Sequence, residues 1–135
     1  MTSEPGPTSD EERRDAGMRT RREVLGDAHV DRSVAATTPF TADFQDFITR
    51  TAWGDVWQRP GLERRERSIA TLSICIALRH WDEFALHVRA AKNNGLSDEE
   101  IAEVIQHAAV YAGVPAANHA FKVAAPILAE LRGEG

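Results

Sequence analysis

Two histidines and a glutamate share a spacing that could support proton transfer. His80, Glu83 and His87 stand at positions i, i+3 and i+7, so one helix face can present all three. Imidazole and carboxylate groups that lie together can move a proton near neutral pH. A solvated polar face has the same pattern, and two histidines with a carboxylate can also bind zinc. Because the histidines are nearly two turns apart and no further ligand is placed, we expect no metal.

Five arginines could bind anionic groups, because a guanidinium matches a carboxylate with two parallel hydrogen bonds. These arginines are Arg59, Arg64, Arg65, Arg67 and Arg89. Glu63 and Glu66 lie among the first four, so a surface ladder of ion pairs, which contributes little stability, is the alternative interpretation. Arg67 is singled out because it stands where the charged start of its helix turns apolar.

The tryptophans and one inter-helix turn complete the set of candidates. Trp53 and Trp57 flank an aromatic corner, although tryptophans more often form a core or an interface than a ligand platform. A Gly-Val-Pro break at 113–115 precedes Asn118 in the first turn of the next helix. Such a break can direct backbone N–H groups and an amide at an anion. A simple turn between two helices is the alternative.

The elements that must position these residues are all helices. A capping-box pattern at Ser9 and Glu12 opens a helix that ends at Gly26, and a loop is expected from there through Thr38. Capping signals and apolar spacing predict the other helices, over about 39–52, 62–78, 81–94, 97–112 and 116–131. The run 69–78 is apolar all round, so we expect it to be covered on every side. The fold class is therefore all-α, a bundle of about six helices.

Length and composition indicate one globular domain. The 135 residues are 42% hydrophobic and 27% charged, which allows a real core. We assign residues 10–132 to this domain and residues 1–9 to a disordered N-terminal lead. The net charge of −5 argues against nucleic acid as a partner, since phosphate binding needs a basic face. Without a signal peptide or a run of roughly 20 apolar residues, we expect a cytoplasmic protein with no membrane partner.

The single cysteine limits the redox chemistry. Cys75 has no second cysteine with which to form an intramolecular disulfide or a Cys-x-x-Cys centre. It lies in the apolar run 72–78, and we expect it to be buried and inert, because reactive thiols need an electropositive, accessible setting. A redox role for this thiol is an alternative within the enzyme class.

Several segments, in their order and spacing, resemble the carboxymuconolactone decarboxylase family, over nearly all of the chain from Asp10 onward. The matching segments are 16–18, 22–30, 53–57, 59–62, 67–68, 87–91, 93–95 and 113–118. The resemblance implies the all-α fold of the alkylhydroperoxidase D family, assembled as trimers or hexamers with sites near subunit interfaces. The peroxidase relatives carry Cys-x-x-Cys-x-x-x-His, and the same spacing here reads His80-x-x-Glu83-x-x-x-His87, so thiol peroxidase chemistry is not available.

The activity that the resemblance implies is decarboxylation of a small anionic lactone, 4-carboxymuconolactone, to β-ketoadipate enol-lactone in protocatechuate catabolism. No cofactor is expected, because the lactone carbonyl can accept the electron pair itself. The expected catalytic residues are His87 as proton donor, Glu83 tuning its charge, and Arg67. The expected substrate-binding residues are Arg89, Trp53, Trp57, His80, Val114 and Asn118. A non-catalytic oligomeric module that binds a small ligand or a protein is the competing hypothesis.

Overall fold

The computed structural model describes residues 9–134, which form two compact units divided between Leu62 and Glu63. Seven α-helices and two shorter helical turns are present, and there is no strand in the described part of the chain. The all-α fold class is thus confirmed, with one helix more than expected. Residues 1–8 of the expected N-terminal lead lie outside the described residues. The assignment of residues 10–132 to a single domain stays a prediction.

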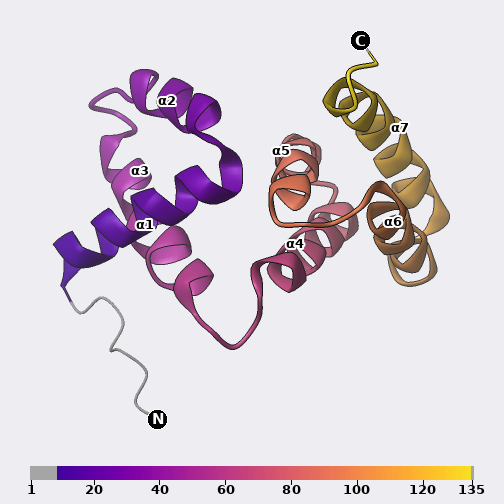
Figure 1. The fold of residues 1–135 in the computed structure, drawn as a ribbon, viewed down its shortest axis with the longest axis horizontal. Helices are drawn as coiled ribbons and strands as arrows, with labels where there is room; N and C mark the ends of the chain where they lie inside the picture. The colour runs from indigo at the N-terminus through magenta and orange to yellow at the C-terminus, as the bar shows by residue number, and fades with distance from the viewer. Residues whose placement is uncertain (1–8, 135) are drawn as a thin grey trace. The chain divides into compact units, whose positions relative to one another are not determined.

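The first unit contains five helical elements (Figure 1). These are α1 (Asp10–Leu25), α2 (Asp27–Ala35), α3 (Ala42–Ile48), the π-helical turn η1 (Thr49–Trp53) and the 3₁₀ turn η2 (Val56–Gln58). The expected start of α1 is confirmed, because the Ser9 hydroxyl accepts the Glu12 N–H at 3.1 Å. The loop expected after Gly26 is wrong, since α2 begins one residue later. Gly26, at φ 91°, reverses the chain in a single residue and is both the C-cap of α1 and the N-cap of α2.

The backbones of α1 and η1 come into direct contact. A Cβ atom added to Gly17 would lie 2.0 Å from the Thr49 carbonyl oxygen. A Cβ atom added to Gly54, which follows η1, would lie 2.2 Å from the Arg13 carbonyl oxygen and 2.6 Å from that of Arg50. No real Cβ atom fits at such distances, so two glycines allow this close approach.

The second unit is built from four α-helices. These are α4 (Arg64–Leu78), α5 (Trp81–Asn93), α6 (Asp98–Ala112) and α7 (Val114–Leu131). The capping box expected at α6 is confirmed: the Ser97 hydroxyl accepts the Glu100 N–H at 3.0 Å, and Glu100 accepts the Ser97 N–H at 2.9 Å. The last helix begins at Val114, two residues before the expected start at 116, because Pro115 fits the first turn, where no N–H donor is needed.

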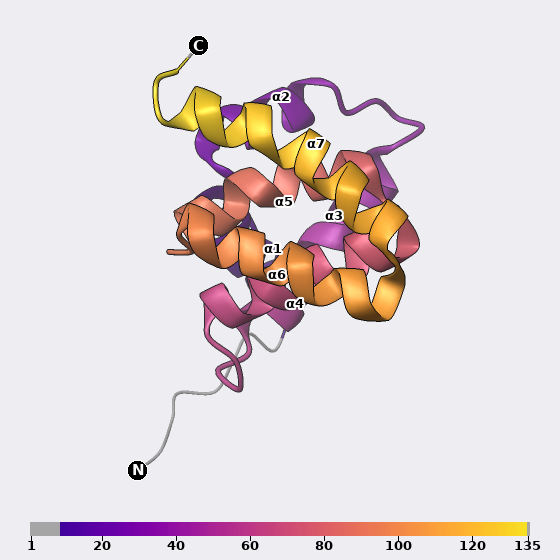
Figure 2. The same ribbon diagram turned by 90° about the vertical axis from the view of Figure 1, so that its right-hand side faces the viewer.

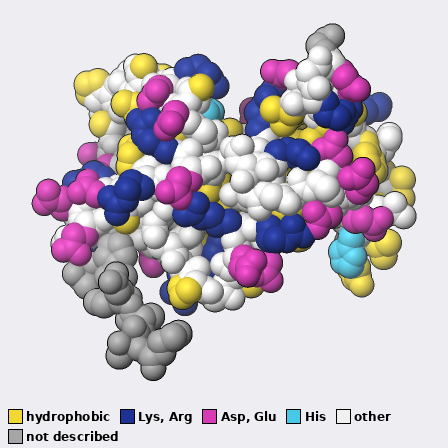
Figure 3. All heavy atoms as spheres, in the orientation of Figure 1, with side chains coloured by type: hydrophobic (Ala, Val, Ile, Leu, Met, Phe, Trp, Pro, Cys, Tyr) yellow, Lys and Arg dark blue, Asp and Glu magenta, His cyan; other side chains and the backbone are white. Residues whose placement is uncertain are grey.

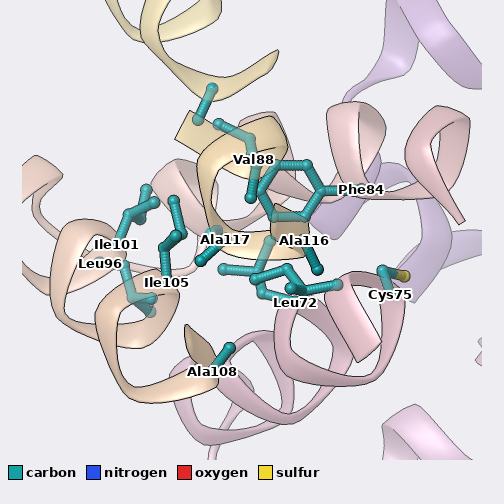
Figure 4. Close-up of a cluster of buried hydrophobic side chains, with 14 of the residues drawn as sticks. Leu72, Cys75, Phe84, Val88, Leu96, Ile101, Ile105, Ala108, Ala116 and Ala117 are labelled. Carbon is teal, nitrogen blue, oxygen red and sulfur yellow. The ribbon is translucent and has the colours of Figure 1, made fainter. Parts of the chain in front are cut away.

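The core of the second unit lies between these four helices. Phe84 and Val88 of α5 and Leu72 of α4 are fully buried, and Figure 4 shows them gathered with Ala116 of α7. The buried residues of α7 are mostly alanines, which let this helix pack closely along α5 and α6 (Figure 2). These contacts bury one side of α5. Polar residues on that side of the helix therefore face the interior of the unit.

One expectation about α4 needs correction. Ile74 and Leu78 are 56% and 59% exposed, so the apolar run is not covered on every side within this chain. At the start of the helix, Glu66 accepts the Glu63 N–H at 2.8 Å and completes a capping box. Arg65 pairs with Glu100 of α6. Acidic and basic side chains alternate over the face seen in Figure 3.

The Arg65–Glu100 pair predicts a pH effect. The Arg65 guanidinium, helped by the Ser97 N–H, lowers the pKa of Glu100 from 4.5 to about 2. A carboxyl whose pKa is depressed by folding adds stability above its unfolded pKa and loses it as the pH falls. We therefore expect Arg65→Gln to raise the pKa of Glu100 toward 4.5, and to lose less stability than the parent between pH 4.5 and 2.

Titration of the side-chain carboxyl carbon by NMR, together with urea unfolding across that pH range, measures both effects. The pair is exposed, so the change in unfolding free energy should be small. A Glu100 titration curve that is the same in Arg65→Gln and the parent would contradict the assignment.

Candidate active site

The predicted proton donor lies on α5 and faces inward. His87 is 7% exposed and stands between the fully buried Phe84 and Val88 in the sequence of the helix. Glu83 is one turn earlier on the same helix and is exposed. His80 is not on the helical face, because α5 begins at Trp81 and His80 is its N-cap residue, with ψ at 77°. The structure therefore keeps Glu83 and His87 on one face and takes His80 out of it.

Two contacts determine how α4 lies against α5. The Asn94 side-chain amide donates to the Ser68 hydroxyl at 2.8 Å near one end of the pair. Near the other end, the negative charge of Glu83 is close enough to raise the pKa of the Cys75 thiol. The two helices are therefore antiparallel, with His87 midway along their contact. Arg67 directly precedes Ser68 and is half-buried. Arg67 and His87 thus belong to two helices that pack against each other, Arg67 at one end of the contact and His87 near its middle.

Cys75 is buried, as expected, with 6% of its surface exposed. Burial raises the pKa of its thiol, and the negative charge of Glu83 raises it further. A thiol in such surroundings stays protonated at neutral pH and is a poor nucleophile. The structure supports its interpretation as a packing group.

We expect Cys75→Ser to keep the turnover of the parent in the decarboxylation that the sequence resemblance implies, because no step of that reaction needs a thiol. Steady-state turnover of the purified variant measures this, with circular dichroism as the check on folding. A folded variant whose turnover falls by about tenfold or more, a difference of roughly 1.4 kcal/mol in the barrier, would give the thiol a catalytic role.

Arg89 is engaged on another side of α5. Its Nη2 donates to the Glu130 carboxylate of α7 at 2.6 Å. Because residues two apart on a helix do not face each other, Arg89 points away from His87. Its role in binding a substrate stays a prediction, as does that of Arg67.

The start of α7 lies close to the start of α5. Trp81 packs on the ring of His119, with ring centroids 4.5 Å apart. Asn118, one residue earlier, is exposed, and Val114 is 70% exposed. His119 was not among the predicted residues, since nothing in its sequence setting distinguishes it except its place beside Asn118. Val114 and Asn118 are therefore on an open surface rather than in a closed pocket of this unit.

The two predicted tryptophans belong to the first unit. Trp53 and Trp57 stack with ring centroids 5.2 Å apart and planes at 29°. Trp53 is 6% exposed, which makes it part of the core of that unit. Trp57 is half-buried and is the one with surface left for a ligand.

One pocket of the second unit lies away from these residues. It lies between α4 and α6, has a volume of about 610 Å³ and is lined by none of the predicted site residues. His107, which the sequence did not single out, lines it and packs on Tyr111 with ring centroids 5.2 Å apart.

Among residues 9–134, no group of three or more His, Cys, Asp or Glu side chains is arranged to hold a metal ion. None of the helices described has both the length and the hydropathy that crossing a bilayer requires.

Comparison with known proteins gives consistent results. The model of the carboxymuconolactone decarboxylase family matches residues 42–126. The chain is 46% identical to 4-carboxymuconolactone decarboxylase of Acinetobacter baylyi, over 91% of this chain and 92% of that protein. It is 43% identical to nitrosuccinic acid decarboxylase of Metarhizium robertsii, over 90% of this chain and 85% of that protein. A 4-carboxymuconolactone decarboxylase of Pseudomonas putida is 54% identical over 34% of this chain and 96% of its own length.

Proposed function

This chain belongs to the carboxymuconolactone decarboxylase family, and we propose that it converts 4-carboxymuconolactone to β-ketoadipate enol-lactone and carbon dioxide. The observation that carries the proposal is the 46% identity to the Acinetobacter baylyi enzyme over 91% of this chain. All three relatives are named as decarboxylases, so loss of carbon dioxide is the part of the proposal with the broadest support. We place the reaction in protocatechuate catabolism in the cytoplasm.

The substrate carries its own electron acceptor. It is an unsaturated five-membered lactone with a carboxylate and an acetate arm on the γ-carbon. When the bond to the carboxylate breaks, its electron pair moves through the ring double bond to the lactone carbonyl and gives an aromatic furanolate. A proton added at the α-carbon then forms the enol-lactone. The protein therefore has to hold the carboxylates, stabilise the oxyanion and deliver one proton, and no cofactor is needed.

His87 is the residue best suited to deliver the proton. It is the one histidine among the predicted site residues that is buried, and it shares a helix face with Glu83. An imidazole can donate a proton near neutral pH, and Glu83 supplies a carboxylate one turn away on the same helix. Arg67 on the adjoining helix can bind the developing oxyanion or the acetate arm as a charge-assisted hydrogen-bond donor.

A carboxylate is lost as carbon dioxide most readily where water is excluded. In the second unit, however, several large apolar residues are exposed to solvent. Val110, Tyr111 and Val114, at the junction of α6 and α7, are 78%, 82% and 70% exposed. An exposed apolar group of this size is typical of a surface that another chain covers. These residues support a homo-oligomer, a trimer or hexamer, whose assembly closes the site.

The Metarhizium robertsii relative raises a second candidate substrate. Nitrosuccinic acid also has a carboxylate next to an electron acceptor, because its nitro group can take the electron pair as a nitronate. That relative is 43% identical to this chain, close to the 46% of the lactone enzyme. The two candidates require the same tasks of the protein and differ in the shape of the acceptor.

The experiment that tests the proposal is an assay of EDTA-treated protein with freshly generated 4-carboxymuconolactone and, in parallel, with nitrosuccinate. Carbon dioxide release and product formation are measured, and light scattering gives the mass of the particle. Rapid turnover of the lactone without metal establishes the proposed reaction. Turnover of nitrosuccinate alone would assign the chain to the second substrate. A folded oligomer that is inactive with both would favour the non-catalytic binding module.

A further inference from the structure

We propose that the first unit contains an anion site in which Arg21 binds the carboxylate of a small monocarboxylic acid, and none of the residues that form it is among those predicted for decarboxylation. The residues that carry this inference all lie in α1, α2, α3 and η1, so it depends neither on the second unit nor on the proposed reaction. Arg21 is 5% exposed and lines a pocket of about 200 Å³.

The guanidinium of Arg21 is held by neutral oxygen atoms. Its Nη2 donates to the Ser33 hydroxyl at 3.1 Å and to the Gln45 side-chain carbonyl at 3.2 Å, and its Nη1 approaches the Thr49 hydroxyl at 3.4 Å. Its Nε is buried and makes no hydrogen bond to any residue of the described chain. The group is therefore fixed in position, and one of its donors is satisfied by no residue of the described chain.

No carboxylate of the described residues pairs with Arg21, in contrast to other arginines of this unit. Arg22, its neighbour, donates to Asp31 at 2.8 Å, and Arg50 donates to Asp46 at 2.7 Å. Burial lowers the pKa of Arg21, and the positive charge of Arg22 lowers it further. A guanidinium nonetheless stays protonated at neutral pH, so Arg21 is a buried positive charge. A buried charge is strongly unfavourable unless an opposite charge accompanies it.

The lining of the pocket selects among anions. Arg14 and Asp46 both line it and form an ion pair with each other, which leaves the charge of Arg21 unbalanced. The Asp46 carboxylate opposes a second negative charge, so a dianion such as phosphate is disfavoured. Met18 and Val34 supply apolar surface beside the charge. A single carboxylate on a short aliphatic chain satisfies the charge and the apolar wall together.

Propionate is the probe for this site. The variant Gln45→Glu places a carboxylate where Gln45 now accepts from Arg21, and so supplies the anion from within the chain. Arg21 itself is left in place because its hydrogen bonds join α1 to α2, α3 and η1. Gln106→Glu, on the exposed face of α6, makes the same change of charge far along the sequence and is the matched control. Ser33→Asp serves as the second variant if Gln45→Glu does not fold.

The measurement is the melting temperature as a function of propionate at constant ionic strength, with propionamide as the uncharged comparison. We expect a saturable rise for the parent and for Gln106→Glu with propionate, and none with propionamide. Gln45→Glu should melt higher than the parent without ligand and bind propionate at least about tenfold more weakly. The proposal would be overturned if propionate did not change the melting temperature of the parent. It would also be overturned if propionate raised the melting temperature of Gln45→Glu as much as that of the parent. Decarboxylase activity plays no part in either outcome.

Discussion

Replacing His87 with alanine should lower the turnover of 4-carboxymuconolactone by about 10²–10⁴-fold, the usual effect of removing a positioned proton donor. The loss should fall on kcat more than on KM, because the proton is needed after the substrate has bound.

His87 is buried, so a fall in activity must be separated from a packing defect. His87→Gln fills similar space without a group that donates a proton near neutral pH, and it should lose as much turnover as the alanine variant. His107→Ala, on α6, removes an exposed histidine and should remain as active as the parent. Urea unfolding and light scattering show whether each variant is folded and assembled. Near-parental turnover in folded His87→Gln would take His87 out of the mechanism.

The second large effect is expected on stability, at the contact between α1 and η1. Gly54→Ala places a methyl group 2.2 Å from one backbone carbonyl oxygen and 2.6 Å from another. Backbone atoms cannot swing aside as a flexible side chain does, so the helix and the π turn must separate. We expect the free energy of unfolding to fall by about 1–3 kcal/mol or more, as for other overpacked interiors.

Gly61 provides the matched control in the same unit. A methyl group added there meets no atom within 4 Å. Gly61→Ala should therefore be neutral or gain about 0.4–1 kcal/mol, because alanine has less conformational freedom to lose on folding. Urea unfolding of both variants gives the comparison. Equal stability of Gly54→Ala and Gly61→Ala would show that the close approach of the two backbones can relax without cost.

Much of the secondary structure was predictable from short stretches of sequence. The starts of α1 and α6 were identified from Ser9 and from the Ser97–Glu100 capping box, because a cap is made by residues only three positions apart. The same local reasoning missed α2, since a single glycine at φ 91° can end one helix and begin another. The wider turn at Thr49–Trp53 also has no local signature in the sequence.

The candidate site was predictable in its residue types and less so in its geometry. Helical spacing placed Glu83 and His87 on one face, and the structure keeps them there. The same spacing included His80, which the structure places at the N-cap because α5 starts one residue later. The packing of α4 against α5 joins Ser68, the residue after Arg67, to Asn94 at the end of α5, while Arg89 binds Glu130. The spacing of residues along one helix does not predict which residues of a second helix will lie next to it.

The all-α class, most helix ends and the family could be predicted from the sequence, because they depend on composition, on near neighbours and on the order of short segments. Which charges are buried and which are paired became known from the packing of the helices. Arg21 and Arg22 are adjacent in the chain, yet one is buried among neutral oxygen atoms and the other binds two aspartates at the surface. The physical reason is that burial and charge pairing arise from residues distant in sequence, such as Gln45 and Thr49, that only packing brings together.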